Sequence, residues 1–151
     1  MKCVIQRVRA ASVSVSGVMV SSIGPGLLIL AGVEKDDDEG EMRAAAVKIR
    51  ELRIFSDPDG KMNLDVSDVE GALLAVSQFT LAGSIDRGRR PGFDRAEKPE
   101  RAKALFEVFV SELGATGLPV STGRFREHMI VSLENDGPVT FIWESTRKSE
   151  C

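Results

Sequence analysis

Two short polar segments carry the residues best suited to chemistry in this chain. The first, Ser77-Gln78-Phe79-Thr80, follows an apolar run, so it lies where a buried strand is expected to end. Hydroxyl and amide groups are costly to bury there without partners. The second, Gly137-Pro138, interrupts a strand-forming region, where glycine permits unusual dihedrals and an X–Pro bond can be cis. From these residues alone, a capped strand end and a simple hairpin turn explain the two segments as well as a functional site does.

Most familiar catalytic and cofactor motifs are missing from the sequence. The one histidine, His128, excludes a histidine-based metal site, and a single histidine beside a strand is typical of a surface or structural residue. The sequence has no phosphate-binding glycine loop, dinucleotide fingerprint or zinc spacing. The consecutive acids at residues 36–39 do not alternate as in a calcium loop, and an amphipathic pattern follows them, so they indicate a helix start. We therefore expect a mechanism that uses no metal and no cofactor.

The hydrophobic pattern predicts the elements that must position these segments. One amphipathic helix is expected after residue 39, and a second from Pro99 to a stop at Gly114. Strands are expected at residues 2–8, 12–16, 18–22, 27–33, 52–55, 73–81, 129–134 and 139–143.

This order of elements predicts an α+β fold, with a largely antiparallel, barrel-like sheet core and two main helices. We expect a single domain over residues 1–144, followed by a polar tail at 145–151. Several of the strands are apolar throughout, which indicates burial on both faces. Such burial is compatible with packing of the sheets on each other or on a second subunit.

Composition is typical of a globular protein in a reducing compartment. Hydrophobic residues make up 42% of the chain and charged residues 28%. Cys3 and Cys151 show no metal-ligand spacing and are expected to be reduced thiols. No signal peptide is recognisable, and the longest apolar run, residues 26–33, is far shorter than the ~20 residues that span a bilayer. We expect a cytoplasmic protein that does not bind membranes.

Charge limits the nucleic acids that this chain could bind. The net charge of −3 argues against indiscriminate binding, and DNA is not an expected partner. Residues 86–103 nevertheless hold seven basic and four acidic side chains. A solvated surface is the commoner meaning of such a cluster, and a contact with RNA phosphates is the alternative.

Taken together, several segments resemble the D-aminoacyl-tRNA deacylase family. Its two signature motifs, S-Q-x-T and N-x-G-P-V-T, are intact at residues 77–80 and 135–140. The joint occurrence of both motifs at this spacing is highly specific, and the resemblance covers nearly the whole chain. Only the charged tail after Trp143 looks unlike a typical member. Further matching stretches lie at residues 5–8, 32–38, 53–57, 60–64 and 122–125.

The resemblance implies a homodimer that hydrolyses the ester bond of D-aminoacyl-tRNA, as chiral proofreading in translation. It implies the same reaction on glycine mischarged on tRNA-Ala, and it implies that the protein binds the 3′ end of aminoacyl-tRNA. A cis Gly137-Pro138 step would enter the partner's pocket and exclude L side chains. Phe125 and Met129 would be walls of that pocket. The implied catalytic residues are Ser77, Gln78, Phe79 and Thr80.

Two mechanisms are compatible with the catalytic segment. Thr80 is the obvious protein nucleophile, but a hydroxyl needs an adjacent base, and residues 77–81 contain no histidine or carboxylate. Alternatively, the 2′-hydroxyl of the terminal ribose assists the attacking water while backbone N–H groups stabilise the oxyanion. We favour the second mechanism, in which Thr80 positions more than it attacks.

Two other functions compete with deacylation of D-aminoacyl-tRNA. A non-catalytic RNA-binding protein would need a basic face with stacking aromatic residues, yet aromatic residues make up only 5% of the chain. The related editing domain of some threonyl-tRNA synthetases would normally be fused to a synthetase. Incubation with D- and L-aminoacyl-tRNA distinguishes these functions, because it shows whether the amino acid is released and whether the released amino acid is the D- or the L-form.

Overall fold

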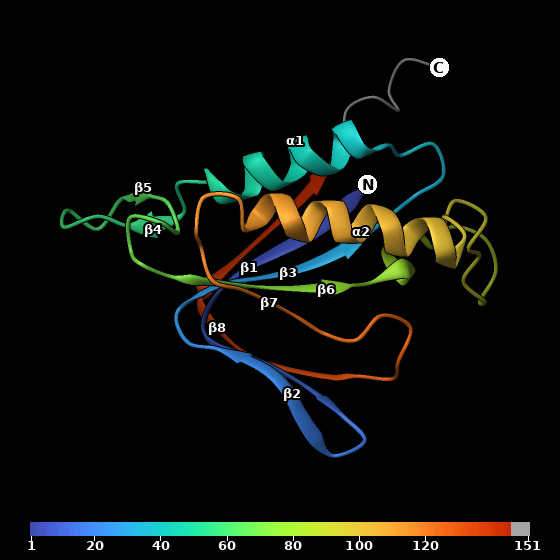
Figure 1. The fold of residues 1–151 in the computed structure, drawn as a ribbon, viewed down its shortest axis with the longest axis horizontal. Coiled ribbons are helices and arrows are strands. Elements are labelled where there is room, and N and C mark those ends of the chain that lie inside the picture. Colours follow the sequence, from blue (N-terminus) through green and yellow to red (C-terminus); the bar gives the residue numbers. More distant parts are fainter. Residues whose placement is uncertain (146–151) are drawn as a thin grey trace.

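The computed structural model describes residues 1–145, so the predicted tail beyond Ser145 lies outside the described residues. Figure 1 shows two helices lying over one face of a strongly curved sheet. The helices are α1 (Glu39–Arg50) and α2 (Pro99–Leu113), and a short 3₁₀ helix, η1, covers Phe79–Ala82. The strands are β1 (Lys2–Val15), β2 (Val18–Ile23), β3 (Gly26–Gly32), β4 (Phe55–Ser56), β5 (Met62–Leu64), β6 (Ala72–Ser77), β7 (Val120–Thr122) and β8 (Ile130–Glu144).

The sheet is built around β1, which is long enough to pair with three other strands. The strand order is β2-β1-β3-β6-β7, and β8 pairs with β1 outside this path. All three pairings of β1 are antiparallel, whereas β3–β6 and β6–β7 are parallel. The small β4–β5 hairpin forms a separate antiparallel pair. The predicted α+β fold, with two main helices and a largely antiparallel, barrel-like sheet, is therefore confirmed.

The central strand β3 is buried on both faces, as its apolar sequence predicts. Leu27 and Ile29 belong to the larger core, which also contains the apolar faces of both helices. Leu28 points to the other face and belongs to a second core with Val13 and Leu74. Side chains alternate across a strand, so a continuous apolar run fills two separate cores.

Both helices begin and end as their terminal residues predict. Asp38 caps α1, and its carboxylate accepts from the N–H of Glu41 while the Glu41 carboxylate accepts from the N–H of Asp38. Pro99 occupies the first turn of α2, and Gly114 caps its C-terminus. Asp38 and Glu39 therefore begin a helix, as expected, whereas the carboxylate of Asp37 accepts from the N–H of Glu34 and from the Met1 nitrogen instead.

Several sequence-based strand predictions are wrong at their boundaries. The two strands predicted at residues 2–8 and 12–16 form the single strand β1. Residues 52–54 are irregular, and β4 begins only at Phe55. The predicted strand 73–81 ends at Ser77, after which the chain turns into η1. The two predicted strands of residues 129–143 form one strand, β8, rather than a hairpin, because both halves pair with β1 and only the register shifts between them. Strands β5 and β7 were not predicted.

No helix within residues 1–145 combines the length and apolar character that crossing a bilayer requires.

Candidate active site

A cavity of about 610 Å³ opens where the ends of β3 and β6 meet the start of α2. The segment that precedes β8 closes its other side. Its lining residues are Val33, Val76, Ser77, Gln78, Phe79, Phe93, Ala96, Glu97, Pro99, Ala102, Phe125, Arg126, Glu127, His128, Met129 and Val131. A concave site with an apolar lining and a few polar groups is the usual form of a small-ligand pocket.

Five of the eight residues singled out in the sequence line this one cavity. Ser77, Gln78 and Phe79 come from the end of β6 and the start of η1. Phe125 and Met129 come from the segment between β7 and β8. The fold thus brings together two segments that are distant in sequence. This grouping is what the resemblance led us to expect.

Thr80 does not line the cavity, although it directly follows residues that do. Its side chain is exposed, and its hydroxyl accepts a hydrogen bond from the carboxamide Nε2 of Gln78. A carboxamide cannot take up a proton at neutral pH, so this contact orients the hydroxyl without activating it.

The turn from β6 into η1 leaves backbone donors at the cavity. The N–H of Gln78 donates to the carbonyl of Ala31 at 2.8 Å, and the N–H of Leu81 donates to the carbonyl of Gln78 at 3.2 Å. The residues between them, Phe79 and Thr80, form the first turn of η1, and first-turn N–H groups have no partner within their own helix. These two donors are therefore available to a bound oxygen atom.

Gly32 allows η1 to approach β3 this closely. A Cβ atom at Gly32 would lie 2.9 Å from the carbonyl oxygen of Gln78 and 2.9 Å from the Cβ of Leu81. Real Cβ atoms essentially never come so close to a neighbour, so a larger residue would push residues 78–81 away from the sheet.

Glu97 places a negative charge in the cavity wall. The pKa of its carboxyl group is lowered from the ordinary value of 4.5, first because the N–H of Lys98 donates to it. The hydrogen bond and positive charge of Arg101 lower this pKa further. Glu97 is therefore ionised at neutral pH, but both of its oxygens already accept hydrogen bonds from the protein.

Two phenylalanines form the rim of the cavity. The ring centroids of Phe79 and Phe93 lie 5.2 Å apart, and Phe79 is 58% exposed. Gly83 makes room for this pair, because a Cβ there would lie 2.9 Å from the ring of Phe93. An exposed aromatic rim offers a surface on which a nucleotide base can stack.

Sequence reasoning missed most of the remaining lining residues. Phe93, Ala96 and Glu97 lie inside the basic stretch that was considered only for its charge. His128 is exposed, as predicted, but it also lines the cavity. Its position next to Met129, within a segment between two strands, was the available signal. Among residues 1–145, no group of acids, cysteines and histidine is arranged to hold a metal ion.

Gly137 and Pro138 lie elsewhere on the chain and do not line the cavity. Both are exposed in the middle of β8, and the peptide bond between them is cis. Gly137 has a φ of 134°, a conformation that is almost restricted to glycine. Within one chain, the structure therefore does not bring this segment next to Ser77, Gln78 and Phe79.

Hydrogen bonds from two side chains brace the Gly137-Pro138 segment. Arg7 donates from Nε to the carbonyl of Asp136 at 3.1 Å and from Nη1 to the carbonyl of Ile54 at 2.8 Å. Asn135 spans the segment from inside, because its Oδ1 accepts from the N–H of Val139 at 2.7 Å. The result is an exposed main-chain segment that is braced by hydrogen bonds on both sides.

Comparisons with known proteins point in one direction. The family model described as "D-Tyr-tRNA(Tyr) deacylase" matches residues 4–144. A D-aminoacyl-tRNA deacylase of Symbiobacterium thermophilum is 52% identical over 97% of this chain and 97% of its own length. A D-aminoacyl-tRNA deacylase of Pelobacter propionicus is 56% identical over 95% of this chain and 99% of its own length.

Solved structures share the fold. One described as "c-Myc DNA Unwinding Element Binding Protein" has a TM-score of 0.91 and 39% identity, covering 96% of this chain and 99% of its own. A second, described as a probable eukaryotic D-amino acid tRNA deacylase, has a TM-score of 0.79 and 18% identity, and covers 94% of this chain and 97% of its own. At that identity the second structure supports the fold alone.

Proposed function

This chain belongs to the D-Tyr-tRNA(Tyr) deacylase family, and on that premise we propose that it hydrolyses the ester bond of D-aminoacyl-tRNA, releasing the free amino acid and tRNA. The observation that carries this proposal is the single cavity that joins Ser77, Gln78 and Phe79 to Phe125 and Met129. Its apolar walls suit an amino-acid side chain, and its polar end suits an ester.

The chemical step requires donors for the oxyanion that forms when water attacks the ester carbonyl. The N–H groups of Phe79, which lines the cavity, and of Thr80, the residue after it, suit this role because they lie in the first turn of η1. Loss of one such donor typically costs about 3–4 kcal/mol of transition-state stabilisation. Backbone placement can therefore supply a large part of the catalysis without a charged side chain.

In this proposal the terminal ribose of the tRNA, rather than Thr80, assists the attacking water. The Thr80 hydroxyl accepts from the carboxamide of Gln78, which cannot serve as its base. We expect Thr80→Ala to keep single-turnover hydrolysis within about tenfold of the wild type, whereas a substrate ending in 2′-deoxyadenosine loses on the order of a hundredfold. A covalent intermediate trapped on Thr80, together with an inactive Thr80→Ala variant that still binds substrate, would refute this mechanism.

Chiral selection in this proposal comes from the Gly137-Pro138 segment of a second protomer. The segment is exposed, projects from β8 and is braced by Arg7 and Asn135, so it can act as a stiff main-chain wall. A wall that faces the Cα atom excludes an L side chain by steric clash and accepts a hydrogen atom. Glycine on tRNA-Ala should therefore be cleaved as well, and failure of that reaction in a single-turnover assay would limit the proposal to D-amino acids.

The apolar surface of β8 supports a homodimer. Within residues 1–145, β8 pairs only with β1, and it exposes Ile130, Leu133, Phe141 and Ile142 by 38–73%. Exposed apolar side chains along a strand that has one edge unpaired favour an interaction surface. We expect Ile142→Glu to give monomers in sedimentation velocity and to lose deacylation. Val18→Glu, at a residue that is 64% exposed on β2, is the matched control and should leave both unchanged.

One assay tests the proposed activity against its rivals. The purified protein is incubated with the D- and L-forms of the same aminoacyl-tRNA, and the released amino acid is measured. Release from the D-form alone supports the proposal. Binding without release indicates an RNA-binding protein, and release of L-serine from tRNA indicates an editing domain of the threonyl-tRNA synthetase type.

A further inference from the structure

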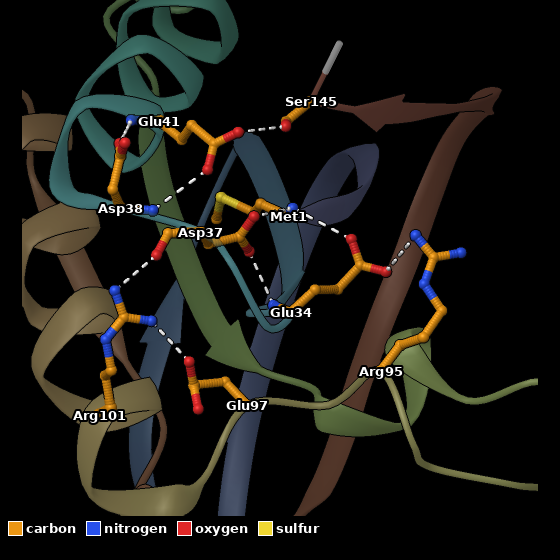
Figure 2. A network of polar contacts seen from close by, with 9 residues as sticks. All are labelled: Met1, Glu34, Asp37, Asp38, Glu41, Arg95, Glu97, Arg101 and Ser145. Carbon is orange, nitrogen blue, oxygen red and sulfur yellow. Dashed lines mark hydrogen bonds and ion pairs between the residues drawn. The ribbon is translucent and has the colours of Figure 1, made fainter. Parts of the chain in front are cut away.

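The α-amino nitrogen of Met1 is buried between two carboxylates, as Figure 2 shows. It lies 2.7 Å from Oδ1 of Asp37 and 3.1 Å from Oε2 of Glu34. Met1 and Asp37 are fully buried, and Glu34 is only 2% exposed. Two buried carboxylates repel each other, so the positive charge between them stabilises their close approach.

The segment that holds these carboxylates also holds a wall of the cavity. Glu34 forms a β-bridge with Ala96, in which the N–H of Lys35 donates to the carbonyl of Arg95 at 2.8 Å. On the neighbouring residues, the N–H of Glu97 donates to the carbonyl of Val33 at 3.3 Å. Val33, Ala96 and Glu97 all line the cavity. The position of Glu34 therefore sets the position of residues 95–97.

Two arginines reinforce this connection from the cavity side, and Figure 2 shows both. Arg95 approaches Oε1 of Glu34 at 3.5 Å. Arg101, on α2, donates to the carbonyl of Asp37 at 2.8 Å and to Oε2 of Glu97 at 2.5 Å. The carboxylate of Glu34 thus contacts Arg95 directly, and Asp37 is joined to Glu97 by Arg101 through its main-chain carbonyl.

We propose that the charged α-amino group of Met1 is a positioning group for the catalytic cavity. Formylation, acetylation or an added residue would each remove its charge and place atoms where the structure is fully packed. The buried carboxylates would then separate, and residues 95–97 would move with the segment they pair with. This inference rests on the proposed deacylation, because it concerns the same cavity.

The test compares one preparation before and after a protease exposes the Met1 amino group. One form of the chain carries an N-terminal fusion that the protease removes without leaving residues. A second form carries a permanent Gly-Ser extension before Met1. Residues 95–97 carry none of the proposed reacting groups, so their displacement should weaken substrate binding in the ground state and the transition state alike. We therefore expect the extended form to show a KM raised by about tenfold, with kcat little changed. Amide hydrogen exchange of residues 93–98 should become faster, while exchange in the β4–β5 hairpin stays the same.

A second variant keeps the test decisive if the extended chain does not fold. Arg101 is half-exposed on α2, so Arg101→Met should fold and should raise KM and amide exchange in the same way. Arg101→Lys should bring KM and amide exchange part of the way back to the wild-type values, because a lysine retains the charge beside Glu97. Arg43→Met, at an exposed residue of α1 whose ion pair within residues 1–145 is with Glu39, is the matched control.

The outcomes separate this inference from the proposed function. A folded extended chain with unchanged KM and unchanged exchange overturns the inference, as does an unaffected Arg101→Met if the extended chain cannot be obtained folded. If the chain with a free Met1 amino group cleaves no D-aminoacyl-tRNA, the proposed function fails. In that case the amide exchange rates of residues 93–98 alone decide whether the Met1 amino group positions residues 95–97.

Discussion

Replacing Asn135 with alanine removes the side chain that braces the Gly137-Pro138 segment from inside. In the native chain its Oδ1 accepts from the N–H of Val139 at 2.7 Å, and its Nδ2 donates to the hydroxyl of Thr140 at 2.9 Å. Val139 is buried, with 7% of its surface exposed, so water cannot readily replace the lost acceptor. Thr140 is exposed, and its hydroxyl can bind water instead.

The expected loss of stability follows from this difference between the two hydrogen bonds. Leaving a buried N–H without an acceptor costs about 1–3 kcal/mol, whereas the exposed bond contributes about 0.5–1 kcal/mol. We therefore expect the free energy of unfolding to fall by about 2 kcal/mol, a factor of roughly 30 in the folded-to-unfolded ratio. The melting temperature of a chain of this size should fall by roughly 2–4 °C for each kcal/mol lost.

Urea denaturation measures the stability, and single-turnover hydrolysis of D- and L-aminoacyl-tRNA measures the chiral selection. If the braced segment is the wall, Asn135→Ala should cleave the L-substrate faster relative to the D-substrate. Asn135→Asp keeps the acceptor for Val139 and should recover most of the stability. An Asn135→Ala protein that is within about 0.5 kcal/mol of the wild type and equally selective would refute the bracing argument.

Further predictions concern other parts of the chain. Burial raises the pKa of the Cys3 thiol from 9.0 to about 12. In a Cys151→Ser background, Cys3 should therefore resist alkylation at pH 8, and rapid labelling of the folded protein would contradict this. Above pH 9 the unfolded chain releases a proton that the folded chain keeps, so stability should fall between pH 9 and about 12. Asp38→Ala removes the carboxylate that accepts from the N–H of Glu41 and should cost about 1 kcal/mol in urea titrations, with no change disproving the role of the cap. Gly26→Ala places a Cβ 1.8 Å from the carbonyl oxygen of Ala72 and should prevent folding, whereas Gly24→Ala meets nothing within 4 Å and should be tolerated. Charge reversal at Arg89 and Arg90 should weaken tRNA binding and reduce its salt dependence, and an unchanged salt slope would exclude this loop from RNA contact.

Local sequence patterns predicted the elements that depend on neighbouring residues. The continuous apolar run of β3 gave its two-sided burial, and the acids before α1 gave its cap. The S-Q-x-T and N-x-G-P-V-T motifs marked the segments now proposed as catalytic and selective. Where the pattern failed, a local signal was ambiguous: Phe79 and Leu81 alternate with polar residues as in a strand and concealed the turn at Gln78, and Gly137-Pro138 resembled a hairpin turn.

Tertiary structure alone decided which distant residues share the cavity. Phe79, Glu97 and His128 meet there because the ends of β3 and β6, the start of α2 and the segment before β8 lie at the same place, and no periodicity along the chain encodes that meeting. The same holds for the Met1 amino group: Asp37, one of its carboxylate partners, was expected only to begin a helix, and Glu34 was given no role. Residue types and spacing determine local conformation through short-range sterics and hydrogen bonds. The neighbours of a buried charge, in contrast, depend on how the whole chain packs, and that packing sets the cavity and the group that we propose positions it.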